Sequence, residues 1–141
     1  MIQNSIKSIL LLILLSIISI SCHKEDFDLE LNSTIWRLLE FKDQNESTFM
    51  KANNDYFLEF KNFSTLGIFL DVNFCSRSYE IVSPGSIEIG STQFCTYICC
   101  DSDFAKKWSN LLPLMTRYYG KGDKLILQGQ GEMVFIRDNR N

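Results

Sequence analysis

The chain has 141 residues, 45% of them hydrophobic and 13% aromatic, and its 14 Lys and Arg against 17 Asp and Glu give a net charge of −3. This length suits one domain with one core, which excludes a large multidomain enzyme and a polytopic membrane protein. The aromatic content excludes a disordered chain. The excess of acidic residues argues against nucleic acid as a partner.

The first 21 residues differ in composition from the rest of the chain. They carry one charge, Lys7, followed by an unbroken apolar run over residues 9–15. Serines soon interrupt this run, and it is too short for a spanning helix, which needs about 20 apolar residues. A basic start, an apolar stretch and then small residues predict a signal peptide over residues 1–21.

The signal peptide would end at a cysteine. The stretch Ser19-Ile20-Ser21-Cys22 resembles the lipobox of bacterial lipoproteins. The resemblance implies cleavage before Cys22 and a diacylglycerol on its sulfur, usually with an acylated N-terminus as well, because a single acyl chain anchors a protein only marginally. An ordinary secretory peptide or an uncleaved anchor helix stays open as an alternative.

Residues 22–31 are rich in acidic side chains, which predicts a flexible tether. Lys24-Glu25-Asp26 resembles the export signal that follows the lipidated cysteine in Bacteroidetes surface lipoproteins. These resemblances imply an outer membrane lipoprotein that is either surface-exposed or periplasm-facing. His23, the one histidine of the chain, lies in this tether and not in a pocket where it could act as a catalytic base.

Short apolar segments separated by turns follow, and each has the length and residue types of a strand. The expected strands are 34–41, 56–60, 66–72, 77–82, 86–89, 114–119, 124–127 and 133–136. In the first of them, Ile35, Leu39 and Phe41 share one parity. Residues 42–54 are polar and are expected to form a loop, and 139–141 form a short tail.

One segment has the period of a helix. An apolar side chain recurs at i, i+4, i+7 and i+8 from Phe104, which predicts a helix near residues 102–112. Ser102 or either neighbouring aspartate can cap its start, and Pro113 should end it. Many short strands with one helix predict the α+β class, with a mostly antiparallel β-sheet of about 7–8 strands.

The order of these elements carries a resemblance to a known family. Trp36-Arg37-Leu38 lies in the first strand and Leu58-Glu59-Phe60 forms the second. Gly122-Asp123 turns a late hairpin, and an apolar strand from Met133 to Arg137 closes the domain. This arrangement resembles the META/HslJ-like domain over residues 32–138. The resemblance implies a role linked to envelope stress and assigns no catalytic residue.

Four cysteines remain if Cys22 is lipidated, namely Cys75, Cys95, Cys99 and Cys100. An even number in an exported domain favours disulfides. Neighbouring cysteines fit disulfide geometry poorly. We therefore expect Cys75 to pair with Cys95, Cys99 or Cys100, and the state of the other two stays open.

Two other uses of these cysteines are weighed against disulfides. A zinc site would favour Cys-x2-Cys knuckles, and the spacing Cys-x3-Cys-Cys lacks them. Cys99 or Cys100 lies just before the expected helix, where a thiolate is favoured, but no Cys-x-x-Cys occurs in a thioredoxin-like frame. We assign no metal, no cofactor and no catalytic residue to the chain.

The sequence therefore predicts a monomeric, lipid-anchored, non-enzymatic cell-envelope domain that meets the membrane through the lipid on Cys22. It would bind an unknown protein or small-molecule ligand, or support envelope stress tolerance. One rival hypothesis is a thiol-dependent redox enzyme or sensor that uses Cys99 and Cys100. The other is a stoichiometric inhibitor of a foreign enzyme that inserts a loop such as 42–54.

Overall fold

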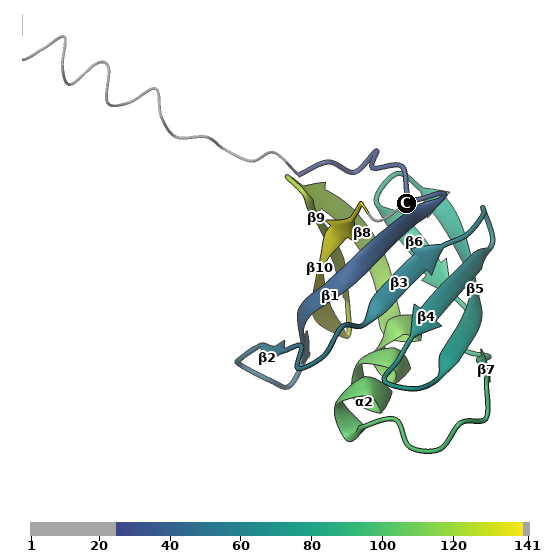
Figure 1. Ribbon diagram of the computed structural model, residues 1–141. Coiled ribbons are helices and arrows are strands. Elements are labelled where there is room, and N and C mark those ends of the chain that lie inside the picture. The colour runs from purple at the N-terminus through teal and green to yellow at the C-terminus, as the bar shows by residue number, and fades with distance from the viewer. Residues whose placement is uncertain (1–24, 140–141) are drawn as a thin grey trace, which may run out of the picture.

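The computed structural model describes residues 25–139 (Figure 1). The predicted signal peptide, Cys22 and His23 lie outside the described residues, as do residues 140 and 141. The elements in chain order are β1 (Thr34–Asp43), β2 (Met50–Lys51), β3 (Phe57–Phe60), β4 (Thr65–Phe69), β5 (Phe74–Ser83), β6 (Ser86–Ile89), β7 (Phe94–Cys95), α2 (Asp103–Leu111), the 3-10 turn η1 (Leu112–Leu114), β8 (Met115–Lys121), β9 (Lys124–Gly129) and β10 (Gly131–Asp138).

Eight antiparallel strands form a closed barrel. The ring runs through β1, β3, β4, β5, β6, β8, β9 and β10, and β10 pairs with β1 to close it. The two-residue strands β2 and β7 lie outside the ring and pair with β1 and β5. Closure gives every strand of the ring a neighbour on each side, whereas an open sheet would have two terminal strands with one free edge each.

The predicted fold class, α+β with a mostly antiparallel sheet, is therefore wrong in its architecture. The strands are antiparallel, as expected, but they close into a barrel with one short helix. The closing pairs join residues about as far apart as the chain allows, such as Ile35 with Asp138. Alternation within a strand specifies which residues face the core and says nothing about which strands lie at the seam.

The core fills the barrel with inward-facing side chains of the strands. In β1 the buried residues are Trp36, Leu38 and Phe41, and the spacing changes because the pairing with β10 shifts register between Leu38 and Glu40. The shared parity predicted for Ile35, Leu39 and Phe41 is therefore wrong, since Phe41 is buried whereas Ile35 and Leu39 are only partly buried. A bulge of this kind inserts one residue and reverses the facing of all that follow.

The helix α2 covers one end of the barrel, here called the helix end (Figure 1). Ser102 is its N-cap, and its hydroxyl accepts the Ala105 N–H at 3.1 Å. Trp108 is fully buried and contacts Phe135 of β10, with ring centroids 6.4 Å apart. The helix lies where the sequence predicted it. In the part of the chain that the structure describes, no helix has the length and apolar character needed to cross a membrane.

Residues 25–31, here called the strap, lie across the opposite end of the barrel, the strap end. They belong to the segment that the sequence assigned to the tether. Asp26 and Gly120 of β8 exchange two backbone hydrogen bonds, of 2.8 and 2.7 Å, and Leu31 is 2% exposed. The strap lies beside the place where the ring has the fewest strand pairs. There, β6 pairs with β8 only through Ser86 and Arg117.

Candidate functional site

Residues 91–102, here called the β7 loop, join β6 to α2 at the helix end and contain three of the cysteines. The loop exposes three large apolar side chains. Phe94 is 72% exposed, Tyr97 is fully exposed and Ile98 is 57% exposed. Apolar side chains of this size are usually buried, so their exposure together on one loop requires an explanation.

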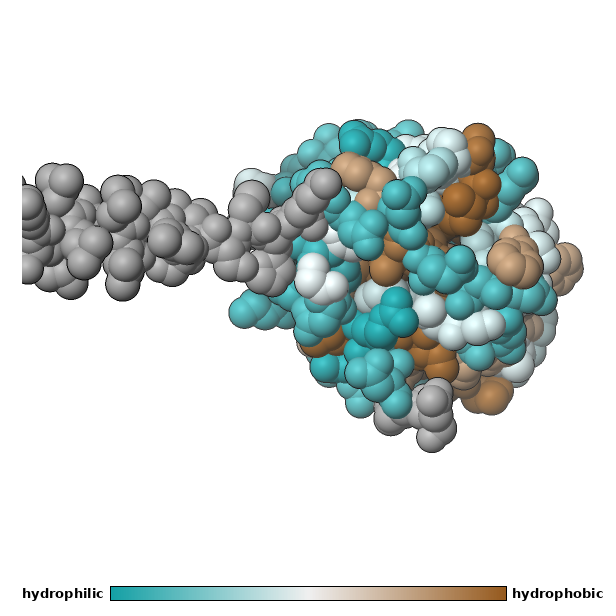
Figure 2. All heavy atoms as spheres, turned by 90° about the horizontal axis from the view of Figure 1, so that it is seen from above, coloured by the Kyte–Doolittle hydropathy of each residue, from teal (hydrophilic) through white to brown (hydrophobic). Residues whose placement is uncertain are grey.

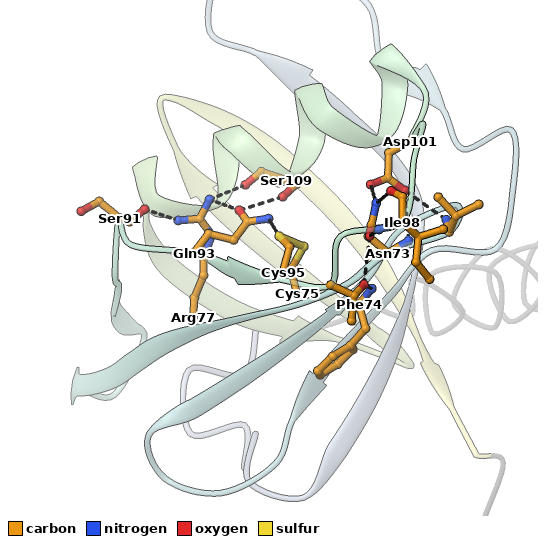
Figure 3. The surroundings of a disulfide bond; sticks show 12 residues. Asn73, Phe74, Cys75, Arg77, Ser91, Gln93, Cys95, Ile98, Asp101 and Ser109 are labelled. Atoms are coloured by element: carbon orange, nitrogen blue, oxygen red, sulfur yellow. Dashed lines mark hydrogen bonds between the residues drawn. A yellow bond between two sulfur atoms is a disulfide. The ribbon is translucent and has the colours of Figure 1, made fainter.

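A disulfide fixes the loop to the barrel wall. Cys75 on β5 and Cys95 on β7 are directly opposite each other in the antiparallel pair, with Cα atoms 4.0 Å apart, and their sulfurs are bonded (Figure 3). Cys75 is buried and Cys95 is exposed. Of the three partners that the sequence left open for Cys75, the structure selects Cys95.

The remaining two cysteines are joined to each other. Cys99 and Cys100 form a bond between neighbouring residues, and both are exposed. The sequence disfavoured this pairing because such neighbours fit disulfide geometry poorly. Cys100 has φ 90°, a backbone conformation rare for a residue with a side chain, at the point where the two side chains meet.

Asn73 and Asp101 hold the second half of the loop (Figure 3). The Asn73 amide accepts from the Ile98 N–H at 2.9 Å and donates to the Ile98 carbonyl at 2.7 Å. Asp101 accepts from the Val72 N–H at 3.0 Å and from the Asn73 amide at 2.7 Å. Burial alone would raise the pKa of Asp101, but these N–H donors outweigh burial and keep that pKa below its usual value.

A second carboxylate, Asp71, joins the turn after β4 to the start of α2. It accepts from the Ser102 N–H at 2.9 Å and hydroxyl at 2.7 Å, from Asn54 at 3.1 Å and from the Tyr56 hydroxyl at 2.8 Å. Burial opposes ionisation of Asp71, but the four donors prevail and lower its pKa to about 2. Asp71 is therefore an ionised anchor for the helix cap.

Arg77 fixes the first half of the loop from inside the barrel. It is only 5% exposed, and it donates to the carbonyls of Gly90 at 3.0 Å and Ser91 at 2.5 Å, to Gln93 Oε1, and to the Ser109 carbonyl at 3.4 Å. Burial lowers the pKa of the guanidinium, whose two terminal nitrogens donate to carbonyl and amide oxygens, whereas its buried Nε has no hydrogen-bond partner among the described residues. One side chain thus ties β5, the β7 loop and the end of α2 together.

The β7 loop is therefore an apolar surface loop whose backbone is held in place by a disulfide and by side-chain hydrogen bonds. A cleft of about 630 Å³ opens beside it, with Arg77, Phe94, Tyr97 and Asn110 in its lining. Across the described residues, no three His, Cys, Asp or Glu side chains are placed to hold a metal ion. The chemistry that the loop offers is apolar and aromatic contact beside a few polar groups.

The sequence predicted only the cysteines of this site. It missed Arg77, Asn73 and Asp101, and it missed the exposure of the loop's aromatic residues. The sequence did contain a signal for this exposure. Phe94, Tyr97 and Ile98 lie close to cysteines in a segment that lacks the alternation of a strand.

The segment 42–54, named above as an inhibitor loop, is partly ordered against the barrel. β1 continues to Asp43, and β2 pairs with β1 through Met50 and Lys51. Lys107 of α2 donates to Glu46 at 2.6 Å, and this hydrogen bond is the main reason that the pKa of Glu46 is lowered. The segment is therefore attached to the helix at its middle.

No family model and no curated protein matches the chain. Among solved structures, a protein from Burkholderia xenovorans studied by NMR matches with a TM-score of 0.63 and 17% identity, over 78% of this chain and 85% of that one. A DUF4847 family protein from Bacteroides vulgatus ATCC 8482, known from a crystal structure, matches with a TM-score of 0.57 and 11% identity, over 79% of this chain and 96% of that one. Such identities show a shared fold alone, and the META/HslJ resemblance stays a prediction.

Proposed function

We propose that this chain is a lipid-anchored, non-enzymatic domain of the cell envelope that binds a partner protein through the β7 loop. The observation that carries the proposal is the exposure of Phe94, Tyr97 and Ile98 on a loop whose backbone is fixed by a disulfide and by side-chain hydrogen bonds. Anchoring through Cys22 and a role in envelope stress tolerance are parts of the same proposal.

Two physical arguments support the use of this loop for binding. Contiguous exposed apolar surface on a soluble domain marks an interaction site, and aromatic side chains are enriched among residues that dominate binding energy. A loop that is already ordered loses little conformational entropy when it binds. The Cys75–Cys95 bond, Asn73 and Arg77 supply that order before any partner arrives.

Site-specific photocrosslinking in intact cells tests the proposal. A benzoylphenylalanine placed at Tyr97 should give one discrete protein adduct, and the same group placed at Val82, which is exposed at the strap end, should not. With the partner identified, Phe94→Asp should weaken binding by roughly 30-fold, since an interface anchor contributes about 2 kcal/mol. Phe63→Asp, an equally exposed aromatic at the strap end, is the matched control.

The lipid anchor has its own test. The intact mass of protein extracted from membranes should correspond to a chain that starts at Cys22 and carries lipid, and Cys22→Ser should move the protein out of the membrane fraction. A chain without lipid mass would refute the anchoring. Absence of any adduct at Tyr97 would instead refute the binding loop and leave the anchor standing.

A redox role is a second candidate, and the exposure of Cys99 and Cys100 beside the start of α2 favours it. Trapping of thiols in living cells before and after reductive stress would separate the two. A redox enzyme or sensor should show Cys99 and Cys100 changing from bonded to trapped, with Cys75 and Cys95 unchanged. A binding domain should keep all four cysteines in one state.

A further inference from the structure

We propose that the strap end of the barrel rests on the membrane and places Phe63, Ile81 and Val82 in the headgroup region of the lipid. The inference rests on the proposed lipid anchor at Cys22 and adds an orientation to it. The partner surface is a neutral, zwitterionic lipid bilayer. The β7 loop at the opposite end would then point away from the membrane.

The first step is that the strap fixes the chain to the barrel very near the proposed anchor. The Asp26 N–H donates to the Gly120 carbonyl at 2.8 Å, and the Asp26 carbonyl accepts from the Gly120 N–H at 2.7 Å. Phe27 packs on Tyr119, with ring centroids 5.8 Å apart. Gly85 has φ 77°, and a Cβ there would lie only 2.7 Å from the Phe27 ring, so the fit is close.

The second step is the reach of the chain. Four residue steps separate Cys22 from Asp26, and four residues span at most about 14 Å in any conformation. β1 has ten residues. A strand of that length is about 33 Å long, and a barrel of tilted strands is then roughly 25 Å from end to end. The anchor therefore holds the strap end beside the bilayer and cannot bring the helix end to it in the same orientation.

The third step is the surface that this end presents. Phe63 in the turn after β3 is 76% exposed, Val82 near the end of β5 is 60% exposed and Ile81 is 38% exposed. Phe63 and Ile81 also line a cleft of about 460 Å³ together with Leu29 and Pro84. Figure 2 looks onto this end and shows apolar residues set among hydrophilic ones. Aromatic and aliphatic side chains of this kind bury favourably at the lipid boundary.

The charges at this end select the kind of lipid. Asp28, Glu30 and Glu80 line the same cleft as Phe63, and together with Asp26 and Asp123 they outnumber the exposed Lys121 and Lys124 beside the β8–β9 turn at this end. Carboxylates near an anionic surface are repelled over about a Debye length, so anionic lipid would weaken the contact. Apolar side chains flanked by carboxylates therefore suit a neutral surface of phosphatidylcholine or phosphatidylethanolamine better than an anionic surface that contains phosphatidylglycerol.

Depth-dependent fluorescence quenching tests the orientation on the full lipidated protein. The reporter variants Phe63→Trp and Val82→Trp place tryptophan at the strap end, and Tyr97→Trp places it at the helix end as the matched control. Native Trp36 and Trp108 are buried and supply a constant background. In phosphatidylcholine vesicles that carry a brominated lipid, the two strap-end reporters should show a blue shift and lose emission, and the helix-end reporter should keep its emission.

Each outcome has one meaning. Quenching confined to the strap end, and reduced when phosphatidylglycerol is mixed in, supports the proposal. A lipidated protein in which neither strap-end reporter is quenched, or in which Tyr97→Trp is quenched as strongly, overturns the orientation and leaves the anchor intact. Quenching that phosphatidylglycerol does not reduce overturns the choice of neutral lipid. A protein without lipid mass removes the anchor and the orientation together.

Discussion

Single side chains, more than strands, hold the helix end together. Asp71 receives hydrogen bonds from the cap of α2, from Tyr56 and from Asn54, so one carboxylate connects three separate segments. Arg77 does the same from inside the barrel for the β7 loop and α2. For each residue, the effect of a substitution on the free energy of unfolding can be predicted and measured.

For Asp71, the pKa gives a pH window. Because its pKa falls from 3.8 in the unfolded chain to about 2 in the folded protein, its ionised form stabilises the fold above pH 3.8. That contribution is lost as pH falls through about 2.

We expect urea unfolding from pH 6 to pH 2, at steps of about one unit, to show that Asp71→Asn is less stable than the wild type at pH 6 and equally stable at pH 2. Glu88→Gln, an exposed carboxylate on β6, is the control. A difference that does not change with pH would contradict the assignment.

For Arg77, the prediction concerns geometry. Arg77→Lys keeps the positive charge. The single ammonium nitrogen of lysine cannot replace the two terminal guanidinium nitrogens, each of which donates to two of the four acceptors. Loss of donors to the part-buried carbonyls of Gly90 and Ser91 and to the buried carbonyl of Ser109 should cost about 2–3 kcal/mol of unfolding free energy. Urea unfolding at pH 7 measures this loss, with Arg37→Lys on a partly exposed side chain as the control. Equal stability of the two variants would show that the hydrogen bonds of Arg77 contribute little.

At the scale of elements, the sequence predicted the helix and most strands because each has a local period. The hairpin of β8 and β9 and the cap of α2 lie where turn and cap residues placed them. The two-residue strands β2 and β7 have no period to detect. The inward position of Arg77 in β5 was also missed, since an arginine at a core position contradicts the pattern that reveals the core.

The two disulfides should differ sharply in their effect on stability. The Cys75–Cys95 bond spans 20 residues, and closing a loop of that length stabilises by about 3 kcal/mol in the chain-entropy model. The Cys99–Cys100 bond joins neighbours and closes no such loop. In a Cys99→Ala and Cys100→Ala background, reductant should therefore lower the unfolding free energy by about 3 kcal/mol, and the background itself should match the wild type.

Hydrogen exchange provides the companion measurement for that pair. Once Cys75 and Cys95 are reduced, the backbone amides of the β7 loop should exchange faster, whereas those of α2 should change little, since Asp71 and Ser102 still hold the helix cap. Equal acceleration in both elements would show that the disulfide supports the whole helix end and not the loop alone.

At the scale of the molecule, the sequence could not reveal that the sheet closes. Closure depends on the pairing of β1 with β10, and the alternation within a strand does not specify which strand it pairs with. The strap was missed for a related reason. Its acidic residues resemble a solvated tether, but the pairing of Asp26 with Gly120, the packing of Phe27 on Tyr119 and the burial of Leu31 show that it belongs to the folded body.

Closure of the barrel has a direct consequence for amide exchange along β10. In an antiparallel strand, successive N–H groups point to opposite neighbours. β10 pairs with β1 over Ile35 to Asp43 and with β9 over Lys124 to Gly129, so N–H groups on both sides of it are hydrogen-bonded. Native-state exchange followed by NMR should thus show protection of consecutive amides from Met133 to Ile136. An open sheet with β10 as its terminal strand would leave every second amide of β10 unprotected, and that alternation is the result that would contradict the barrel. The two-residue strand β2, which pairs with β1 alone, gives the fast-exchanging reference in the same spectrum.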